Sequence, residues 1–396
     1  MWQAPGRIHR TTIEIEEVET SYTNQKELFM KRYYIIFIFV FTLMQLRAIS
    51  QGCVAIRSNG NTCSLAKPGA AKEWQFNFNT RYYKSYKHFI GKEEQKEREE
   101  EGTNVINHSF AWDFTFAKAL NNRWSVAFNI PILSYVRSSM YEHYGNNSTK
   151  AGARRNTESF GIGDIRLTAY RWMFDPAKSH RGNLQIGLGI KLATGDYRYM
   201  DDFHKLSSTG EDSSVIGPVD QSIQLGDGGT GIVGELNGYY SFSHKFSVYG
   251  SAFYLLNPRE QNGTSTARGG TPNANAIKYY TSTMSVPDQY MLRGGVNYMV
   301  DNFNVSAGMR IEGIPSSDLV GGDKGFRRPG IVTSIEPTIS YNIKKGNIYL
   351  SVPVAMIRNR TQSYSDKLRS ADTGMKVNGD AAFADYVINA GFAIRL

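Results

Sequence analysis

With 396 residues, the chain is long enough for two soluble domains, but no linker or change in composition marks a boundary between them. Aromatic residues make up 13% of the chain while the mean hydropathy stays at −0.40, and no stretch after residue 50 is long and apolar enough for a transmembrane helix. The formal net charge of +9 comes with no nucleic-acid-binding motif, so we expect no nucleic-acid partner. The many glycines and tyrosines instead favour a β-barrel.

The first strongly apolar run of the chain starts at residue 30. Two basic residues precede an almost unbroken apolar core over residues 33–46, and the small residues Ala48 and Ser50 follow it. This order is typical of a secretory signal peptide that is cleaved after Ser50. A core of about 14 residues is also shorter than the roughly 20 that span a bilayer as a helix. We therefore expect residues 30–50 to be a signal peptide, with an N-terminal membrane anchor as the alternative.

The segments on either side of the signal peptide carry separate expectations. Residues 1–29 are polar and lack a targeting pattern, so we interpret them as an over-extended start without structure of its own. Residues 51–72 are expected to form a periplasmic N-terminal segment that contains both cysteines of the chain, Cys53 and Cys63. In an oxidising compartment these two cysteines could form a disulfide. Lipidation of Cys53 is the alternative.

Apolar side chains at alternate positions recur along residues 73–396. This period of two is the signature of β-strands whose neighbouring side chains face lipid and lumen in turn. In chain order the segments that carry it span residues 74–82, 110–116, 124–130, 165–169, 184–192, 232–240, 246–254, 292–298, 303–311, 331–341, 348–356 and 384–396. The sequence therefore predicts an all-β fold, a transmembrane antiparallel β-barrel of about 12 strands in the outer membrane of a Gram-negative-type bacterium.

The connections between these segments alternate in length. Short turns are expected near residues 121–123, 175–182, 244–245, 301–302 and 344–347. Long polar segments lie near residues 88–106, 137–160, 195–230, 257–287, 314–329 and 358–380. Short periplasmic turns and long external loops are typical of outer membrane barrels. The last segment ends in "YVINAGFAIRL", which resembles the C-terminal signal read by the barrel-assembly machinery, so that machinery is an expected partner.

Two prolines fall within the predicted strands. A proline has no N–H to donate to the neighbouring strand. We therefore expect a bulge at Pro337 and another at Pro353.

Charged residues occupy positions between the apolar ones of these strands. If the apolar side chains face lipid, the charged ones face the lumen, where both signs occur in similar number. Mixed signs favour a network of paired charges over an ion-selective ring, and a polar lining for a channel is the alternative. The expected lumen-lining residues are Arg81, Asp113, Asp164, Arg166, Lys191, Glu235, Arg293, Arg310, Glu312, Glu336, Asp385 and Arg395.

Three stretches in the first half of the barrel, "RWSVAFNIPIL", "GIGDIRLTAYRWMF" and "GNLQIGLGIKLATGDY", carry a family resemblance. Together they resemble the outer membrane family associated with the meta-pathway of phenol degradation. The shared pattern is a strand that ends in a proline, here Pro131, then a GxGD run at residues 161–164, and then Thr194 followed by Gly195. Ala193 stands where the family commonly has a proline. The resemblance implies an outer membrane, transport-like protein and assigns no substrate.

The function that we expect from such a barrel is the passage of small solutes, apolar or aromatic ones among them. Two alternatives stay open, a structural or surface-interaction barrel with a plugged lumen and a lipid-modifying enzyme. An enzyme would need a nucleophile beside one of the histidines, and no G-x-S-x-G elbow occurs. We expect no catalytic residue, no metal site and no cofactor. Outer membrane lipid and lipopolysaccharide are the expected partners of the basic exterior. The histidines considered are His88, His108, His143 and His204.

Overall fold

The computed structural model describes residues 73–396, and most of their regular structure is antiparallel β-sheet. The expectations for residues 1–72, which concern the start, the signal peptide and the Cys53–Cys63 pair, lie outside the described residues. Within the described part, no helix is long and apolar enough to cross a membrane.

Twelve wall strands close into a barrel, because the last of them pairs with the first. Two of the twelve are interrupted, so each of these consists of two segments. The predicted all-β barrel of 12 antiparallel strands is confirmed. In chain order the wall consists of β1 (Trp74–Ile90), β3 (Ile106–Ala119), β4 (Trp124–Ser139), β5 with β6 (Arg155–Ile162 and Arg166–Trp172), β7 (Gly182–Lys191), β10 (Gly231–Ser241), β11 (Phe246–Leu256), β14 (Gln289–Val300), β15 (Phe303–Ile314), β16 (Gly330–Ile343), β17 with β18 (Gly346–Ser351 and Val354–Arg360) and β19 (Ala381–Arg395).

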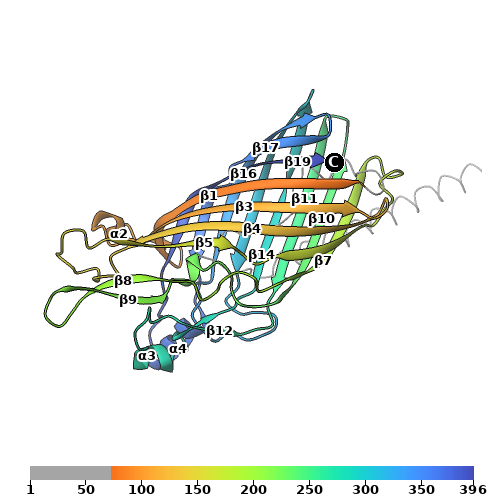
Figure 1. Ribbon diagram of the computed structural model, residues 1–396. Helices are drawn as coiled ribbons and strands as arrows, with labels where there is room; N and C mark the ends of the chain where they lie inside the picture. Colours follow the sequence, from red (N-terminus) through yellow and green to blue (C-terminus); the bar gives the residue numbers. More distant parts are fainter. Residues whose placement is uncertain (1–72) are drawn as a thin grey trace, which may run out of the picture. The chain divides into compact units, whose positions relative to one another are not determined.

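The remaining elements lie in the long connections. They are β2 (Glu93–Glu94), α2 (Glu97–Glu100), β8 (Met200–Leu206), β9 (Asp212–Pro218), the 3-10 helix η1 (Gln221–Ile223), β12 (Gln261–Ser265), α3 (Ala274–Lys278), β13 (Thr283–Ser285) and α4 (Tyr364–Thr373). The strands β8 and β9 form one hairpin, and β12 pairs with β13. Figure 1 shows α2, α3, α4 and the β8–β9 hairpin toward one end of the barrel, here called the loop end, and the C terminus toward the opposite, short-turn end.

The alternating pattern of the sequence becomes an apolar outer wall and a polar inner wall. On β7 the side chain of Leu188 is 65% exposed, whereas Gln185 of the same strand is 9% exposed. Ile186 and Ile190 are exposed like Leu188. Apolar surface left in water costs about 25 cal/mol per Å², so a continuous wall of such side chains is a surface for lipid to cover.

Aromatic side chains cover the outside of the seam where the barrel closes. Phe78 of β1 lies opposite Phe392 of β19 and Phe114 of β3, with ring centroids 5.6 Å and 5.2 Å apart. Two residues earlier on β1, the ring centroid of Phe76 lies 5.0 Å from that of Phe116. Aromatic pairs of this kind each contribute about 0.5–1.5 kcal/mol beyond the area that they bury. Linked across three strands, they stabilise the pairing that joins the two ends of the sheet.

The two prolines differ in their effect. At Pro353 the wall strand breaks between β17 and β18. Pro337 stays in register with β15, and its carbonyl accepts the N–H of Val352. The irregularity of β16 lies instead at Thr333 and Ser334, where its pairing with β18 shifts. Of the two expected bulges, the one at Pro353 is replaced by a break in the wall strand, and the one at Pro337 is wrong because this residue stays in register.

Several strands extend further toward the loop end than the apolar pattern predicts. β4 continues to Ser139 and β5 begins at Arg155, both inside the stretch 137–160 that was expected to be loop. β5 pairs with β4, while on the other side of this interrupted strand β7 pairs with β6 and not with β5. The β5 sequence RNTESFGI is mostly polar, so its strand character comes from the hydrogen bonds to β4 and leaves no apolar period to detect.

We expect Leu188→Arg to lower the free energy of unfolding by about 2–4 kcal/mol, because it places a charge on the lipid-facing wall. Gln185→Arg should cost less, since the new charge stays on the inner side of the same strand. Gly187 is a poorer inner control, because a Cβ there would lie 2.6 Å from the Tyr170 ring. A denaturant titration in phospholipid vesicles measures both variants. Equal losses would contradict the orientation of β7.

Candidate functional site

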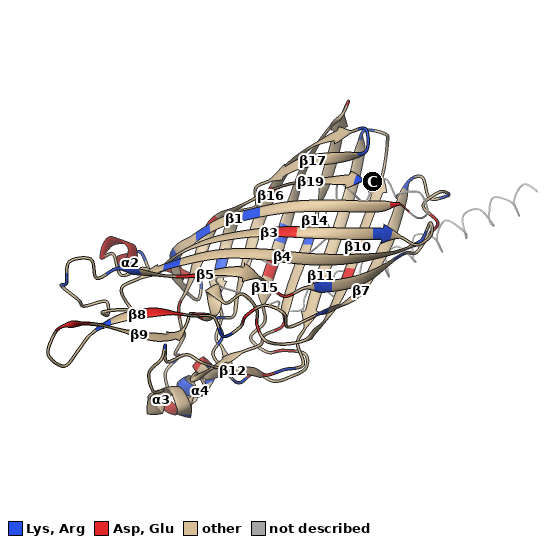
Figure 2. Cartoon of the chain, viewed as in Figure 1, with Lys and Arg blue, Asp and Glu red and all other residues tan. Residues whose placement is uncertain are grey.

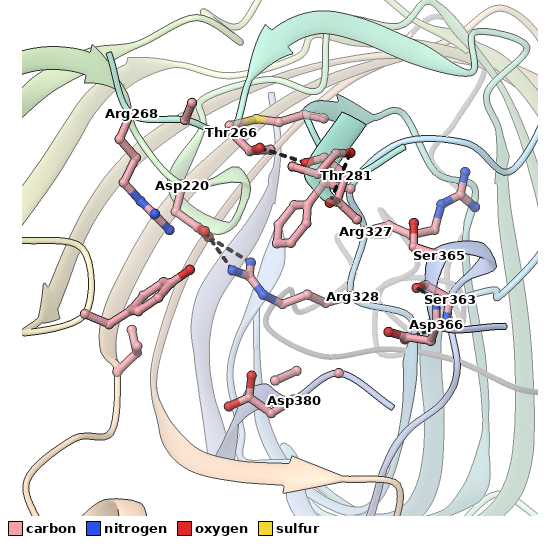
Figure 3. A pocket seen from close by; sticks show the side chains of 18 of the residues that line it. Asp220, Thr266, Arg268, Thr281, Arg327, Arg328, Ser363, Ser365, Asp366 and Asp380 are labelled. Atoms are coloured by element: carbon pink, nitrogen blue, oxygen red, sulfur yellow. Dashed lines mark hydrogen bonds and ion pairs between the residues drawn. The ribbon is translucent and has the colours of Figure 1, made fainter. Parts of the chain in front are cut away.

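A cavity of about 870 Å³ opens at the loop end of the barrel. Each long connection contributes to its wall, namely those between β1 and β3, β4 and β5, β7 and β10, β11 and β14, β15 and β16, and β18 and β19. Figure 3 shows Asp220, Arg268, Arg328 and Asp366, which come from different connections, around one space. We call this space the loop-end cavity.

Arginine dominates the polar lining of the loop-end cavity. Its acidic lining residues are Asp220, Asp366 and Asp380. Figure 2 shows that residues of both charges occur in the connections at the loop end, whereas the barrel strands are mostly uncharged. The lining arginines are Arg98, Arg137, Arg268, Arg327, Arg328, Arg360 and Arg369.

Three of these arginines share two buried carboxylates. The guanidinium of Arg328 donates to both carboxylate oxygens of Asp220 at 2.8 and 2.7 Å, and Arg137 lies 3.6 Å from the same carboxylate. Arg137 also donates to Glu142 at 2.8 Å, and Arg268 donates to the other oxygen of Glu142 at 3.0 Å. Burial by itself would raise the pKa of Asp220, but Arg137 and Arg328 hold it well below its ordinary value. This carboxylate is therefore ionised across the physiological range of pH.

Residues 219–225 of the β7–β10 connection fold into the mouth of the barrel, and we call them the inner segment. Val219 and Ile223 are completely buried, and Leu225 packs against Ala111 of β3 and Leu133 of β4. The Ser159 hydroxyl of β5 donates to the carbonyl of Ile223. The inner segment therefore narrows the barrel just beneath the loop-end cavity.

The motif residues of the family resemblance meet where the wall strand breaks between β5 and β6. Gly163 donates its N–H to the Pro131 carbonyl at 2.9 Å. The Thr194 hydroxyl donates to the Gly163 carbonyl at 2.9 Å, and the Asp164 carboxylate accepts the N–H of Gly195 at 3.0 Å. The proline, GxGD and TG signatures are thus parts of one junction that ends the strand and starts the connection to the inner segment.

Glycine is required at this junction by a close approach of the backbone. A Cβ on Gly195 would lie 2.4 Å from the carbonyl oxygen of Leu225, in the inner segment. A Cβ on Gly163 would lie 2.7 Å from the Leu133 side chain and 3.1 Å from the same carbonyl. Both distances are shorter than van der Waals contact. The junction therefore holds the inner segment directly against the wall.

The structure brings most of the charged residues expected on the inner wall into pairs. Arg81 and Asp113 lie 3.3 Å apart, and Arg310 and Glu312 lie 2.7 Å apart. Arg293 of β14 reaches Glu336 of β16 at 2.7 Å, and Lys191 reaches Asp164 at 3.4 Å. Buried charges are tolerated when they are paired in this way. The pairs are the following: Arg81–Asp113, Lys191–Asp164, Arg293–Glu336 and Arg310–Glu312.

The other expected inner-wall residues have different surroundings. Arg166 is buried beside Asn129 at 3.2 Å and over the Phe253 ring, while Glu235 accepts from the Tyr170 hydroxyl at 3.1 Å. Asp385 is only partly buried. Its partners are Tyr86, Lys87 and Arg358, near the loop end of the seam. Arg395 instead lines a cavity of about 260 Å³ at the short-turn end of the barrel.

The histidines considered for catalysis contact groups other than a nucleophile. His88 lies 2.7 Å from Asp380, and His108 lies 3.0 Å from the Tyr82 hydroxyl. The Nδ1 of His143 accepts the backbone N–H of His204 at 3.1 Å. These contacts place the rings in structural networks at the loop end and on the outer wall.

The arginines of the loop-end cavity are the functional residues that sequence reasoning missed. They come from separate connections, and the period-two pattern says nothing about loops. The adjacent pair Arg327 and Arg328 in "GFRRPG" is the one local signal that could have pointed to them. Arg137 was assigned to the start of a loop, and Arg268 and Arg369 carry no local motif.

No protein-family model and no curated protein sequence matches this chain. Among solved structures, an outer membrane channel from Pseudomonas putida F1 superimposes with a TM-score of 0.54 at 10% identity, covering 86% of this chain and 100% of that one. The P. putida toluene transporter TodX and the CymD monoaromatic hydrocarbon channel give TM-scores of 0.41 and 0.43, both at 10% identity. They cover 82% and 89% of this chain, and 90% and 98% of their own. At this identity the first similarity establishes the fold alone, that of an outer membrane β-barrel.

Proposed function

We propose that this chain is an outer membrane channel that passes small solutes, apolar or aromatic ones among them. The observation that carries the proposal is a cavity at each end of one closed barrel, about 870 Å³ at the loop end and about 260 Å³ at the short-turn end. A solute would enter at the loop-end cavity, pass the inner segment and leave between the short turns. The resemblance to the phenol meta-pathway family supports a transport-like outer membrane protein and leaves the solute unassigned.

The paired charges of the inner wall fit a channel lining as well as a structural network. Arg293 and Glu336 join β14 to β16 across β15, so their pair spans the inner face of one strand. A lining whose charges are neutralised in pairs presents no strong field to an uncharged solute. The proposed lining contains eleven of the twelve charged residues named from the sequence. The exception is Asp385, whose partners lie near the loop end of the seam.

A plugged barrel with a structural or surface role is the second candidate. The inner segment favours it, because completely buried residues such as Ile223 occupy the mouth of the barrel. In that case the external connections would carry the function. Within either candidate, we propose that residues 30–50 are removed on export and that lipid and lipopolysaccharide surround the wall.

The mature chain, residues 51–396, should conduct ions in a planar phospholipid bilayer. We expect small aromatic solutes to reduce the current as they occupy the lumen, because they displace water and ions there. Single-channel recording of the purified, refolded protein measures this. A control protein heated before reconstitution excludes leaks. A correctly folded barrel that never conducts would reject the channel and favour the plugged barrel.

Gly195→Ala should raise the conductance, because the new methyl group would push the carbonyl of Leu225, and with it the inner segment, away from the wall. We expect a stability loss of about 1–3 kcal/mol from the forced shift. Gly234→Ala on β10 is the matched control, since its nearest neighbour would be 3.9 Å from the new Cβ. Recordings of the two variants make the comparison. An unchanged conductance for Gly195→Ala would mean that the inner segment does not limit the passage.

A further inference from the structure

We propose that the loop-end cavity is a binding site for small aromatic carboxylates and gives the channel a preference for anionic solutes. The preference in transport rests on the proposed channel function, whereas the binding site stands on its own geometry. The inference comes from the balance of charges in the lining and from the aromatic rings that lie beneath two of its guanidiniums.

The described lining of the cavity contains more cations than anions. Seven arginines face three aspartates. Three further carboxylates, Glu142, Asp318 and Asp323, pair with lining arginines from outside the cavity wall. Counting these three as well, the arginines of the described part still outnumber the carboxylates by one. A concave, partly desolvated space of this kind attracts anions more strongly than a flat surface with the same charges.

The excess of positive charge in the described lining is located at two places. Among the described residues, Arg137, Arg268 and Arg328 form ion pairs with two carboxylates, those of Glu142 and Asp220, so three guanidiniums meet two acids in this part of the lining. The second place is Arg369 of α4. Its described contact is with the Tyr279 ring at 5.0 Å, and it forms no ion pair with any residue of the described part.

Two guanidiniums of the cluster, those of Arg268 and Arg328, are more exposed than its two carboxylates. The side chains of Glu142 and Asp220 are 0% and 4% exposed. Those of Arg268 and Arg328 are 21% and 15% exposed. A solute in the cavity would therefore meet the donors of the arginines before the oxygens of the acids. Figure 3 shows the Arg268 and Arg328 guanidiniums on either side of Asp220.

Backbone strain at Arg268 supports a role for this side chain. Its φ is 50°, in the left-handed region, which costs a residue with a Cβ roughly 1–2 kcal/mol. The backbone of Arg268, in the β11–β14 connection, packs closely against β9. A Cβ on Gly217 of β9 would lie 2.2 Å from it. Strain of this kind persists where the surroundings impose it and is concentrated at functional sites. Here it keeps the guanidinium at the cavity wall.

Two aromatic rings lie beneath the guanidiniums that face the cavity. Arg328 stacks over the Phe326 ring at 4.6 Å, and Arg268 stacks over the Tyr141 ring at 4.8 Å. The Tyr141 and Phe326 rings belong to the lining of the cavity themselves. A guanidinium binds a carboxylate through two parallel N–H donors, and a neighbouring ring or methyl surface packs against an aromatic solute. The combination matches a benzoate-like anion better than an inorganic one.

Binding to the refolded protein in detergent tests the site without any requirement for transport. The probes are benzoate, its uncharged analogue benzamide, and inorganic phosphate, each titrated by calorimetry. We expect benzoate to bind most tightly. Arg268→Gln should weaken benzoate binding about tenfold, the usual effect of losing one charge-assisted contact. Glu142 keeps its contact with Arg137 at 2.8 Å in that variant, so the cluster retains a paired carboxylate.

Two further variants make the test robust. Arg369→Gln removes the charge of the α4 arginine and breaks no described ion pair, so it serves if Arg268→Gln does not fold. Lys205→Gln, on the β8–β9 hairpin outside the cavity lining, removes the same charge and should leave binding unchanged. Equal affinities for benzoate and benzamide, or equal losses in Lys205→Gln and Arg268→Gln, would overturn the site. Phosphate that binds as tightly as benzoate would overturn the aromatic part and point to phosphate groups.

Transport is measured separately, so that the two proposals can fail independently. In a bilayer under a salt gradient, the reversal potential should indicate a preference for anions that is smaller in Arg268→Gln and unchanged in Lys205→Gln. Benzoate that binds to a barrel that never conducts would reject the channel and keep the site. A conducting barrel without benzoate binding or anion preference would keep the channel and reject the site.

Discussion

The pairing of β19 with β1 determines what the interior of this barrel can contain. Once the sheet closes, every second side chain of the wall points into a confined space, and the others form a continuous apolar surface. Charged side chains in that space lose water and are tolerated when they meet an opposite charge. Arg81 with Asp113, and Arg293 with Glu336, are arrangements of this kind. The aromatic contacts around Phe78 stabilise the closing pair from the outside.

The inner segment is held in the mouth of the barrel because one wall strand is interrupted. The pairing of β5 with β4 ends at Gly163 and Asp164. The Thr194 hydroxyl donates to the Gly163 carbonyl there, and the Gly195 N–H donates to the Asp164 carboxylate. The segment that follows then packs Leu225 against the wall. The short motifs that produce the family resemblance therefore encode the local geometry that holds the inner segment in the mouth of the barrel.

The sequence predicts the wall of this barrel much better than its connections. A period of two along strands such as β7 follows from lipid on one side and a polar lumen on the other, so the sequence alone assigns Leu188 and Gln185 to opposite faces. β5 was missed because it carries polar residues on both faces. The break at Pro353 could be anticipated, since a proline cannot complete the ladder.

The loop-end cavity could not be predicted, because its residues come together only through the packing of separate connections. Asp220 and Arg328 are far apart in the sequence, and nothing near either residue indicates the other. Arg268 lies in a third connection. The period of two in a sequence indicates which side chains of a strand face the apolar side. A cavity of this kind depends instead on contacts between loops, whose sequences have no such period.

The entrance and the lumen differ in how their charges are balanced, and this difference gives them different effects on a solute. Inside the wall, Arg81 and Arg293 each meet a carboxylate on a neighbouring or nearby strand, so the field there is largely cancelled. At the loop-end cavity, three guanidiniums of the described part meet two carboxylates of the described part. Charges at an aqueous entrance act over about 8 Å at physiological ionic strength. In the proposed channel, the entrance would therefore select by charge, while the lumen beneath it would discriminate mainly by size and by fit past the inner segment.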